Sequence, residues 1–155
     1  PYYGPQTQAS SDIIAPGTPG EPMVFEGHVL RTTGEPVVGA TVEIWQTHGD
    51  GDYDLTGTNC RGHQFTDENG AFRFNTVRPI GYGVASLSCI GILDFRAAHI
   101  HVKIKTDEKQ ITTGIFFADD PRCKRDVGYR MMGYKTVFDL EKTEDGLTAR
   151  FDFVL

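Results

Sequence analysis

Two histidines separated by a single residue are the first feature of this sequence that could do chemistry. They are His99 and His101, and Arg96 precedes them by three positions. In a β-strand, alternate side chains share one face, so both imidazoles would point in the same direction. Two imidazoles on one face supply half of a metal site. A His-x-His pair by itself is a weak motif, because a solvated strand face gives the same pattern.

Two tyrosines add a second kind of donor. Tyr53 follows Gly-Asp-Gly-Asp at 49–52, and Tyr82 follows Pro-Ile-Gly at 79–81. Both stretches are typical of loops that leave a strand. A tyrosine has a pKa of about 10, so it ligates at neutral pH only where the metal stabilises its phenolate. Phenolate oxygen with imidazole nitrogen suits oxidised iron. Each tyrosine alone could be an aromatic packed on the rim of the fold, but the pair favours a ferric site.

Arg96, close to the two histidines, is a further candidate for chemistry. Arg96 carries a permanent positive charge, which could stabilise negative charge that develops during a reaction. A surface cation is the ordinary alternative. Trp45 and Gln46, which precede the loop of Tyr53, are expected to serve sheet packing and an edge hydrogen bond. The remaining histidines have no spacing that assigns a role: His28, His48 and His63.

Composition and missing motifs exclude several function classes. The net charge is −6, from 15 basic and 21 acidic residues, and no stretch interleaves basic and aromatic side chains. Nucleic acid is therefore not an expected partner. The longest apolar runs, such as 115–118, are too short to cross a membrane, so we expect a soluble protein. No Gly-x-Ser-x-Gly elbow, P-loop or Rossmann glycine fingerprint is present.

The length predicts one folded domain with an extended arm before it. A chain of 155 residues can bury a single core without staples. Residues 1–22 hold five of the eight prolines, together with polar side chains, so we expect an extended arm there. The folded domain is expected over 23–155.

Short runs of strand-like sequence fill the domain. In 147–155, apolar residues alternate with polar ones, as on a half-buried strand. Asn69-Gly70 and Asp145-Gly146 are dipeptides typical of tight hairpins. The pattern predicts an all-β fold, an antiparallel two-sheet β-sandwich with long loops and little or no helix, whose loops carry the function. The predicted strands are 23–30, 40–46, 71–76, 98–105, 111–117, 134–140 and 147–155.

The three cysteines, Cys60, Cys89 and Cys123, lie in segments expected to be loops. None has the close spacing of a zinc or thioredoxin motif. One disulfide with one free thiol could form in three pairings. Three unpaired cysteines are the other alternative, and the sequence does not choose between them.

The order of motifs along the chain resembles that of the intradiol ring-cleavage dioxygenases, which include catechol and protocatechuate dioxygenases. The block with the two histidines, 96–101, is matched together with Tyr53 and Tyr82. The resemblance covers nearly the whole domain, and the matching blocks are 27–30, 34–46, 50–53, 61–62, 66–79, 82, 96–101, 112–113 and 117–121.

This resemblance implies a ligand set and a reaction. Tyr53 and His99 would be equatorial ligands of Fe(III), Tyr82 and His101 axial ligands, and a hydroxide would complete the coordination. Arg96 matches the family's arginine beside the bound catechol. The implied reaction uses O2 to cleave the bond between the two hydroxylated carbons of a catechol, giving a cis,cis-muconate-type diacid. Tyr82 would accept a substrate proton as it leaves the metal, and no organic cofactor is needed.

The sequence departs from the family pattern in three ways. Gly114 stands where the family often has Gln, which predicts a wider substrate pocket. The interval from Tyr82 to Arg96 is long, and 83–95 could form a distinct lip. The helical dimerisation segment of bacterial catechol dioxygenases is missing. The short form resembles secreted eukaryotic members, so we expect an extracellular monomer, with Pro1 as a processed or trimmed start.

Two other classes of function remain as alternatives. The first is a non-catalytic β-sandwich binding module that kept the family's strands and lost its chemistry. The presence of all four ligand types argues against it. The second is a zinc hydrolase built on His99 and His101, which would lack a third His or carboxylate ligand at a clear spacing.

Overall fold

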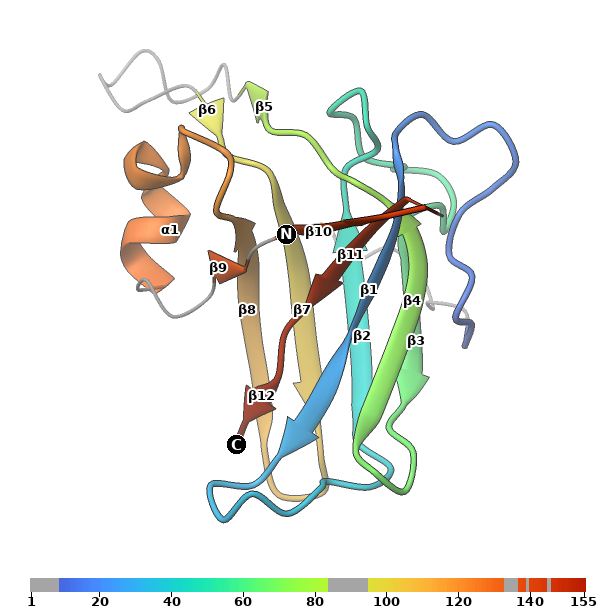
Figure 1. Cartoon of the computed structure of the whole chain (residues 1–155), viewed down its shortest axis with the longest axis vertical. Helices are drawn as coiled ribbons and strands as arrows, with labels where there is room; N and C mark the ends of the chain where they lie inside the picture. Colours follow the sequence, from blue (N-terminus) through green and yellow to red (C-terminus); the bar gives the residue numbers. More distant parts are fainter. Residues whose placement is uncertain (1–8, 84–94, 133–136, 139, 145) are drawn as a thin grey trace.

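The structure is a computed structural model that describes residues 9–83, 95–132, 137–138, 140–144 and 146–155. Two sheets of five strands each pack face to face, and a short two-stranded ribbon lies at one end (Figure 1). The predicted all-β sandwich is therefore confirmed. One sheet contains β10 (Leu140–Thr143), β11 (Gly146–Arg150), β1 (Pro22–Leu30), β12 (Phe153–Val154) and β4 (Ala71–Val77).

The second sheet carries the two histidines. Its strands, in spatial order, are β3 (Arg61–Phe65), β2 (Thr41–Gln46), β7 (His99–Lys105), β8 (Gln110–Phe117) and β9 (Val137–Phe138). The ribbon pairs β5 (Tyr82–Gly83) with β6 (Phe95–Arg96). A 3-10 turn, η2 (Cys123–Arg125), and a short helix, α1 (Val127–Met132), follow β8.

Alternation of side chains builds the core between the sheets. Phe25 of β1 lies directly opposite Phe74 of β4, and both are fully buried. From the other sheet, Ile100 and Val102 of β7 point into the same core. The intervening residues of β7 therefore face outward from the core, and His99 and His101 belong to that outward face.

Pairing is antiparallel between most neighbouring strands, but β1 pairs in parallel with both β11 and β12, and β8 pairs in parallel with β9. The predicted strand 147–155 is thus two strands. The strand is interrupted at Phe151, whose backbone lies against Gly27 of β1. A Cβ on Gly27 would lie 1.9 Å from the Phe151 carbonyl oxygen. Only a glycine permits this approach. Asp152 then accepts a hydrogen bond from the His28 backbone N–H at 2.8 Å.

Other elements differ from the sequence prediction in detail. Gly146 of the predicted Asp145-Gly146 hairpin begins β11, which pairs antiparallel with β10, whereas Asp145 lies outside the described residues. Asn69-Gly70 instead joins β3 of one sheet to β4 of the other, so it is not a hairpin between paired strands. Strand β3 was not predicted. The predicted strand 134–140 lies partly outside the described residues, and its described part is divided between β9 and β10.

Residues 9–21 run along the sandwich without forming a strand of their own. Isolated bridges join Ala9 to His63 and Asp12 to Asn75. Ile13 is buried within the main core, which the proline content did not indicate. Among the described residues, no helix is long and apolar enough to cross a membrane.

The buried ring of Phe74 should contribute strongly to the stability of the fold. Replacing Phe74 with Ala removes a fully buried ring, so the free energy of unfolding should fall by about 3–5 kcal/mol. Val38 is 63% exposed, and Val38→Ala should change it by less than about 0.5 kcal/mol. Urea unfolding of both variants measures the difference. Equal losses would contradict the assignment of Phe74 to the core.

Candidate metal centre

The start of β7 holds the two imidazoles beside each other. Nε2 of His99 lies 3.1 Å from Nε2 of His101. Nδ1 of His99 lies 2.6 Å from the Ala97 carbonyl oxygen, so its N–H donates there. This hydrogen bond leaves the lone pair of His99 on Nε2. Two ring nitrogens that point at one location can bind a single metal ion.

Aromatic packing fixes the orientation of both rings. The Trp45 indole stacks on His101, with ring centroids 4.8 Å apart and an angle of 7° between planes. Phe116 of β8 stacks on His99 at 5.2 Å. Trp45 therefore serves packing, as predicted, and Gln46 donates a hydrogen bond to the Val77 carbonyl at 2.6 Å.

Burial keeps both imidazoles neutral. It lowers the pKa of His99 to about 4. The pKa of His101 falls to about 3, first because of burial and then because His99 and Arg96 lie nearby. A neutral imidazole is the form that binds a metal, so neither ligand needs to lose a proton at neutral pH.

The two tyrosines complete a ring of four donors. The Tyr53 ring lies edge-on to Tyr82 at 5.5 Å between centroids, and it lies 6.4 Å from His101. The Tyr82 ring lies 6.0 Å from His99. The structure thus brings together all four side chains that the sequence predicted as ligands, although they come from three separate segments.

The hydroxyl of Tyr53 is buried and has no hydrogen-bond partner among the described residues. Burial raises the pKa of Tyr53 above its usual value, and the neighbouring Tyr82 phenol raises it further. A buried, unpaired hydroxyl is costly unless a ligand satisfies it. Two phenols and two neutral imidazoles suit Fe(III), whose charge would stabilise the phenolate form.

Close contact between two loops brings the tyrosines together. Gly51 has a φ of +93°, and a Cβ there would lie 3.3 Å from the Gly81 carbonyl oxygen. The Thr47 hydroxyl donates to the Ile80 carbonyl at 2.9 Å.

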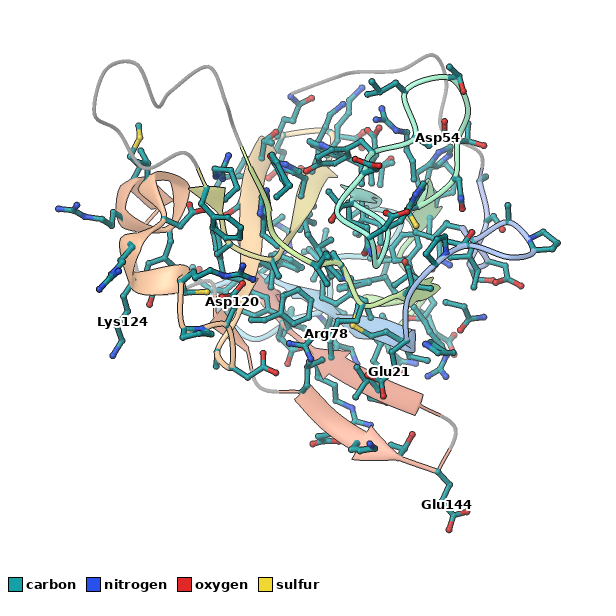
Figure 2. The ribbon with its side chains drawn as sticks, turned by 90° about the horizontal axis from the view of Figure 1, so that it is seen from above. Glu21, Asp54, Arg78, Asp120, Lys124 and Glu144 are labelled. Atoms are coloured by element: carbon teal, nitrogen blue, oxygen red, sulfur yellow. The ribbon has the colours of Figure 1, made fainter. Side chains whose placement is uncertain are left out.

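Beyond Tyr53, the Asp54 carboxylate accepts backbone N–H groups of the following turn. These bonds lower the pKa of Asp54 to about 2. Figure 2 shows the molecule from above, and the labelled Asp54 and Asp120 lie well apart in this view.

Arg96 lies beside the tyrosines, since β5 and β6 place Tyr82 directly opposite it. Its guanidinium Nε lies 3.0 Å from the buried carboxylate of Asp126. A second buried carboxylate, Asp120, accepts the Ala98 backbone N–H at 2.9 Å. Sequence reasoning missed both aspartates as supports of the site. The only signal available was the matched block 117–121, which contains Asp120.

The remaining predicted residues are also placed. Gly114 of β8 is buried directly opposite His101, on the strand beside the ligands. Cys60 and Cys123 are buried free thiols. Burial raises their pKa values to about 12 and about 11. Cys89 and the predicted lip lie outside the described residues, apart from Gly83 and Phe95 in the ribbon.

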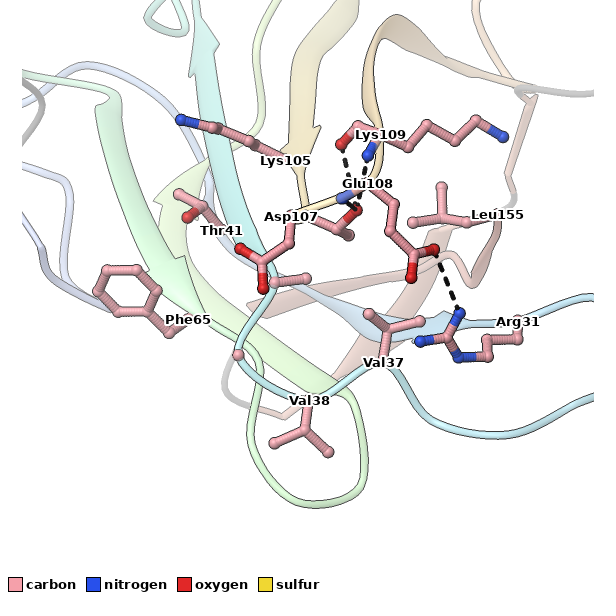
Figure 3. A pocket seen from close by; sticks show the side chains of 13 residues that line it. Arg31, Val37, Val38, Thr41, Phe65, Lys105, Asp107, Glu108, Lys109 and Leu155 are labelled. Atoms are coloured by element: carbon pink, nitrogen blue, oxygen red, sulfur yellow. Dashed lines mark hydrogen bonds and ion pairs between the residues drawn. The ribbon is translucent and has the colours of Figure 1, made fainter.

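A cavity of about 440 Å³ lies at the opposite end of β7 (Figure 3). Apolar Val37 and Phe65 line it together with Lys105 at the end of the strand. An ion pair of 3.8 Å joins Arg31 to Glu108 at its edge. None of the four candidate ligands lines this cavity, so it is separate from the candidate metal centre.

Comparison with known proteins identifies the family. A family model described as dioxygenase matches residues 1–155. A hydroxyquinol 1,2-dioxygenase of Rhodococcus opacus is 34% identical over 133 residues, which cover 78% of this chain and 44% of that enzyme. A catechol 1,2-dioxygenase of Pseudomonas sp. (strain EST1001) is 36% identical, and the match covers 74% of this chain and 42% of that enzyme. The chain therefore belongs to the intradiol ring-cleavage dioxygenase family.

Solved structures agree with this placement. The dioxygenase domain of a dioxygenase and carbohydrate-binding protein fusion from Streptomyces sp. SirexAA-E is 30% identical, with a TM-score of 0.85. That match covers 100% of this chain and 92% of the solved domain. A 3-chlorocatechol 1,2-dioxygenase from Rhodococcus opacus 1CP, 24% identical with a TM-score of 0.90, shows the same fold. The chain spans about half the length of the two curated enzymes named above.

The zinc alternative loses support from the donor set. Within the described ranges, no group of three His, Cys, Asp or Glu side chains could hold a metal ion. Zinc sites in enzymes generally use three such protein ligands. The groups that accompany His99 and His101 here are phenols.

The histidine pKa values predict how acid affects the metal-free protein. An unfolded histidine has a pKa of about 6.5, so between about pH 4 and 6.5 the unfolded chain binds more protons. The free energy of unfolding should therefore fall as the pH drops through this window, by about 1.4 kcal/mol per pH unit for each extra proton.

Urea unfolding of metal-free protein at pH 7, 6 and 5 checks this. The His101→Asn variant has one fewer imidazole with a lowered pKa, so its free energy of unfolding should depend less steeply on pH. Equal slopes for the variant and the wild type would show that His101 is not held neutral.

Proposed function

We propose that this protein is an Fe(III)-dependent enzyme that cleaves catechol-type aromatics with O2 to cis,cis-muconate-type products. One observation carries the proposal: two phenols and two neutral imidazoles lie together at the start of β7, and the buried Tyr53 hydroxyl has no hydrogen-bond partner among the described residues. Tyr53, Tyr82, His99 and His101 would hold the ion. When bound, Fe(III) would chelate both catechol oxygens and activate the ring toward O2.

The side chains around the ion have separate roles in this proposal. The Tyr53 hydroxyl is buried and has no hydrogen-bond partner among the described residues, so Tyr53 suits a permanent ligand. Tyr82 lies on a two-residue strand and is partly exposed, so it can leave the ion and accept a catechol proton at its Oη. The Arg96 guanidinium, 23% exposed, would stabilise negative charge that develops on the substrate.

The names of the relatives support the substrate class without selecting one compound. The two enzymes compared above are named for hydroxyquinol and catechol, and both substrates carry adjacent hydroxyls. The extracellular location and the monomeric state implied by the resemblance stay predictions. Size-exclusion chromatography of the iron-loaded protein would test the oligomeric state.

The two tyrosines should respond differently to substitution. Iron-loaded wild type should absorb visible light through phenolate-to-iron charge transfer. Tyr82→Phe should retain iron and part of this absorption, and kcat should fall by about 100-fold or more because a proton acceptor is lost. Tyr53→Phe should shift the band and retain iron weakly.

Spectra and single-turnover kinetics on samples of known iron content make the comparison. His99→Ala should lose iron. Wild-type spectra and rates in both tyrosine variants would show that neither phenol is a ligand. A colourless protein after ferric reconstitution, with no cleavage of catechol, would favour the non-catalytic binding module.

Gly114 should affect the choice of substrate. It lies directly opposite His101, so a side chain at this position would share the face of the sheet that carries the two histidines. Gly114→Gln should lower kcat/KM for substituted catechols more than for catechol itself, by about 10-fold or more. Steady-state kinetics with both substrates measures the ratio. An unchanged ratio would show that position 114 does not line the substrate pocket.

A further inference from the structure

Arg96 is held from one side by a carboxylate that is completely buried. Asp126 is 0% exposed, and its Oδ2 lies 3.0 Å from Nε of Arg96. The same oxygen accepts the backbone N–H of Ala97 at 2.7 Å. Two donors from adjacent residues thus converge on one oxygen. Both donors lie directly before the strand that carries the histidines.

The other carboxylate oxygen of Asp126 binds the helix α1. Oδ1 accepts the backbone N–H of Tyr129 at 3.0 Å, which caps the start of α1. One carboxylate therefore joins the helix to Arg96. Because two backbone N–H groups hold this buried anion in place, its bond to Nε fixes one edge of the guanidinium.

Gly128, in the first turn of α1, provides the space that the guanidinium occupies. A Cβ at this position would lie 2.4 Å from Nη2 of Arg96 and 3.3 Å from its Cζ. Real Cβ atoms do not approach that closely, so any larger residue would displace the guanidinium. Asp126 fixes one edge of the group, and Gly128 leaves room for the other.

We propose that Asp126 and Gly128 are positioning residues for Arg96, and that α1 serves as the support that aims its guanidinium at the substrate. This inference rests on the proposed function of Arg96. Guanidinium orientation decides how much negative charge it can stabilise, and a misplacement of about 1 Å can cost about 100-fold in rate. Asp126 also binds the backbone N–H of Ala97, whose carbonyl contacts His99, so the test has to separate an effect through Arg96 from one through His99.

The kinetic test uses Asp126→Asn, whose amide has one oxygen and cannot satisfy all three donors. We expect kcat to fall by about 10- to 100-fold, with a smaller change in KM and unchanged iron content. In an Arg96→Gln background, the same substitution should change kcat by less than about 2-fold, because the group it positions is absent. Asp119→Asn is the matched control, since the exposed Asp119 pairs with Arg78 instead.

Gly128→Ala provides a second route if Asp126→Asn does not fold, because it keeps the Asp126 carboxylate that binds the backbone N–H groups of Ala97 and Tyr129. It should lower kcat in the same way, and its effect should likewise vanish in the Arg96→Gln background. Wild-type kcat in either folded variant, or a full loss that persists without Arg96, would overturn the proposal.

A spectroscopic measurement tests the positioning without turnover. In metal-free protein labelled with ¹⁵N, the Nε–H of Arg96 should exchange slowly with water, because it is bonded to a buried carboxylate. Asp126→Asn should make this exchange fast, and Gly128→Ala should shift the signal. A fast-exchanging Nε–H in the wild type would refute the contact. If the wild type cleaves no catechol, the proposed function fails, and this spectrum still decides whether Asp126 holds Arg96.

Discussion

Burial of two neutral imidazoles at the start of β7 is the constraint that the rest of the candidate centre has to satisfy. Polar rings removed from water need partners, and these two receive them from different directions. The Ala97 carbonyl accepts the N–H of His99, while Trp45 and Phe116 cover the faces of the two rings. The Nε2 atoms of the two rings lie 3.1 Å apart, so one metal ion could bind both of them.

The tyrosines close the same site from above, and their loops depend on each other. The loop of Tyr53 and the chain before Tyr82 touch through backbone atoms near Gly51 and Gly81. Neither loop contains a regular element of its own beyond the two-residue strand β5. The sandwich holds these loops in place, and the loops carry the two tyrosines. Functional residues of β-proteins commonly lie on loops that a rigid scaffold positions. Binding of one ion by all four donors would tie these segments together.

Helix α1 shows how a short element can support such a site. Six residues are too few for a stable helix in isolation. Here the Asp126 cap, the packing of Tyr129 on Phe116 and the bond to Arg96 stabilise it. Phe116 in turn stacks on His99, so the helix contacts both the arginine and, through one ring, a candidate ligand. Its stability and the geometry of the site therefore depend on the same contacts.

The sequence by itself determined the sandwich class, most core strands and the four candidate ligands. Strand alternation is a local property, and the types of donor limit the metal that suits them. Local patterns could not show that 147–155 divides at Phe151, because that break depends on the close approach of Gly27. They could not predict α1 either, since tertiary contacts rather than a helical stripe stabilise it. Only the tertiary structure decided that Asp126 meets Arg96 across thirty residues of chain, because such a contact depends on where β8 directs the segment that follows it.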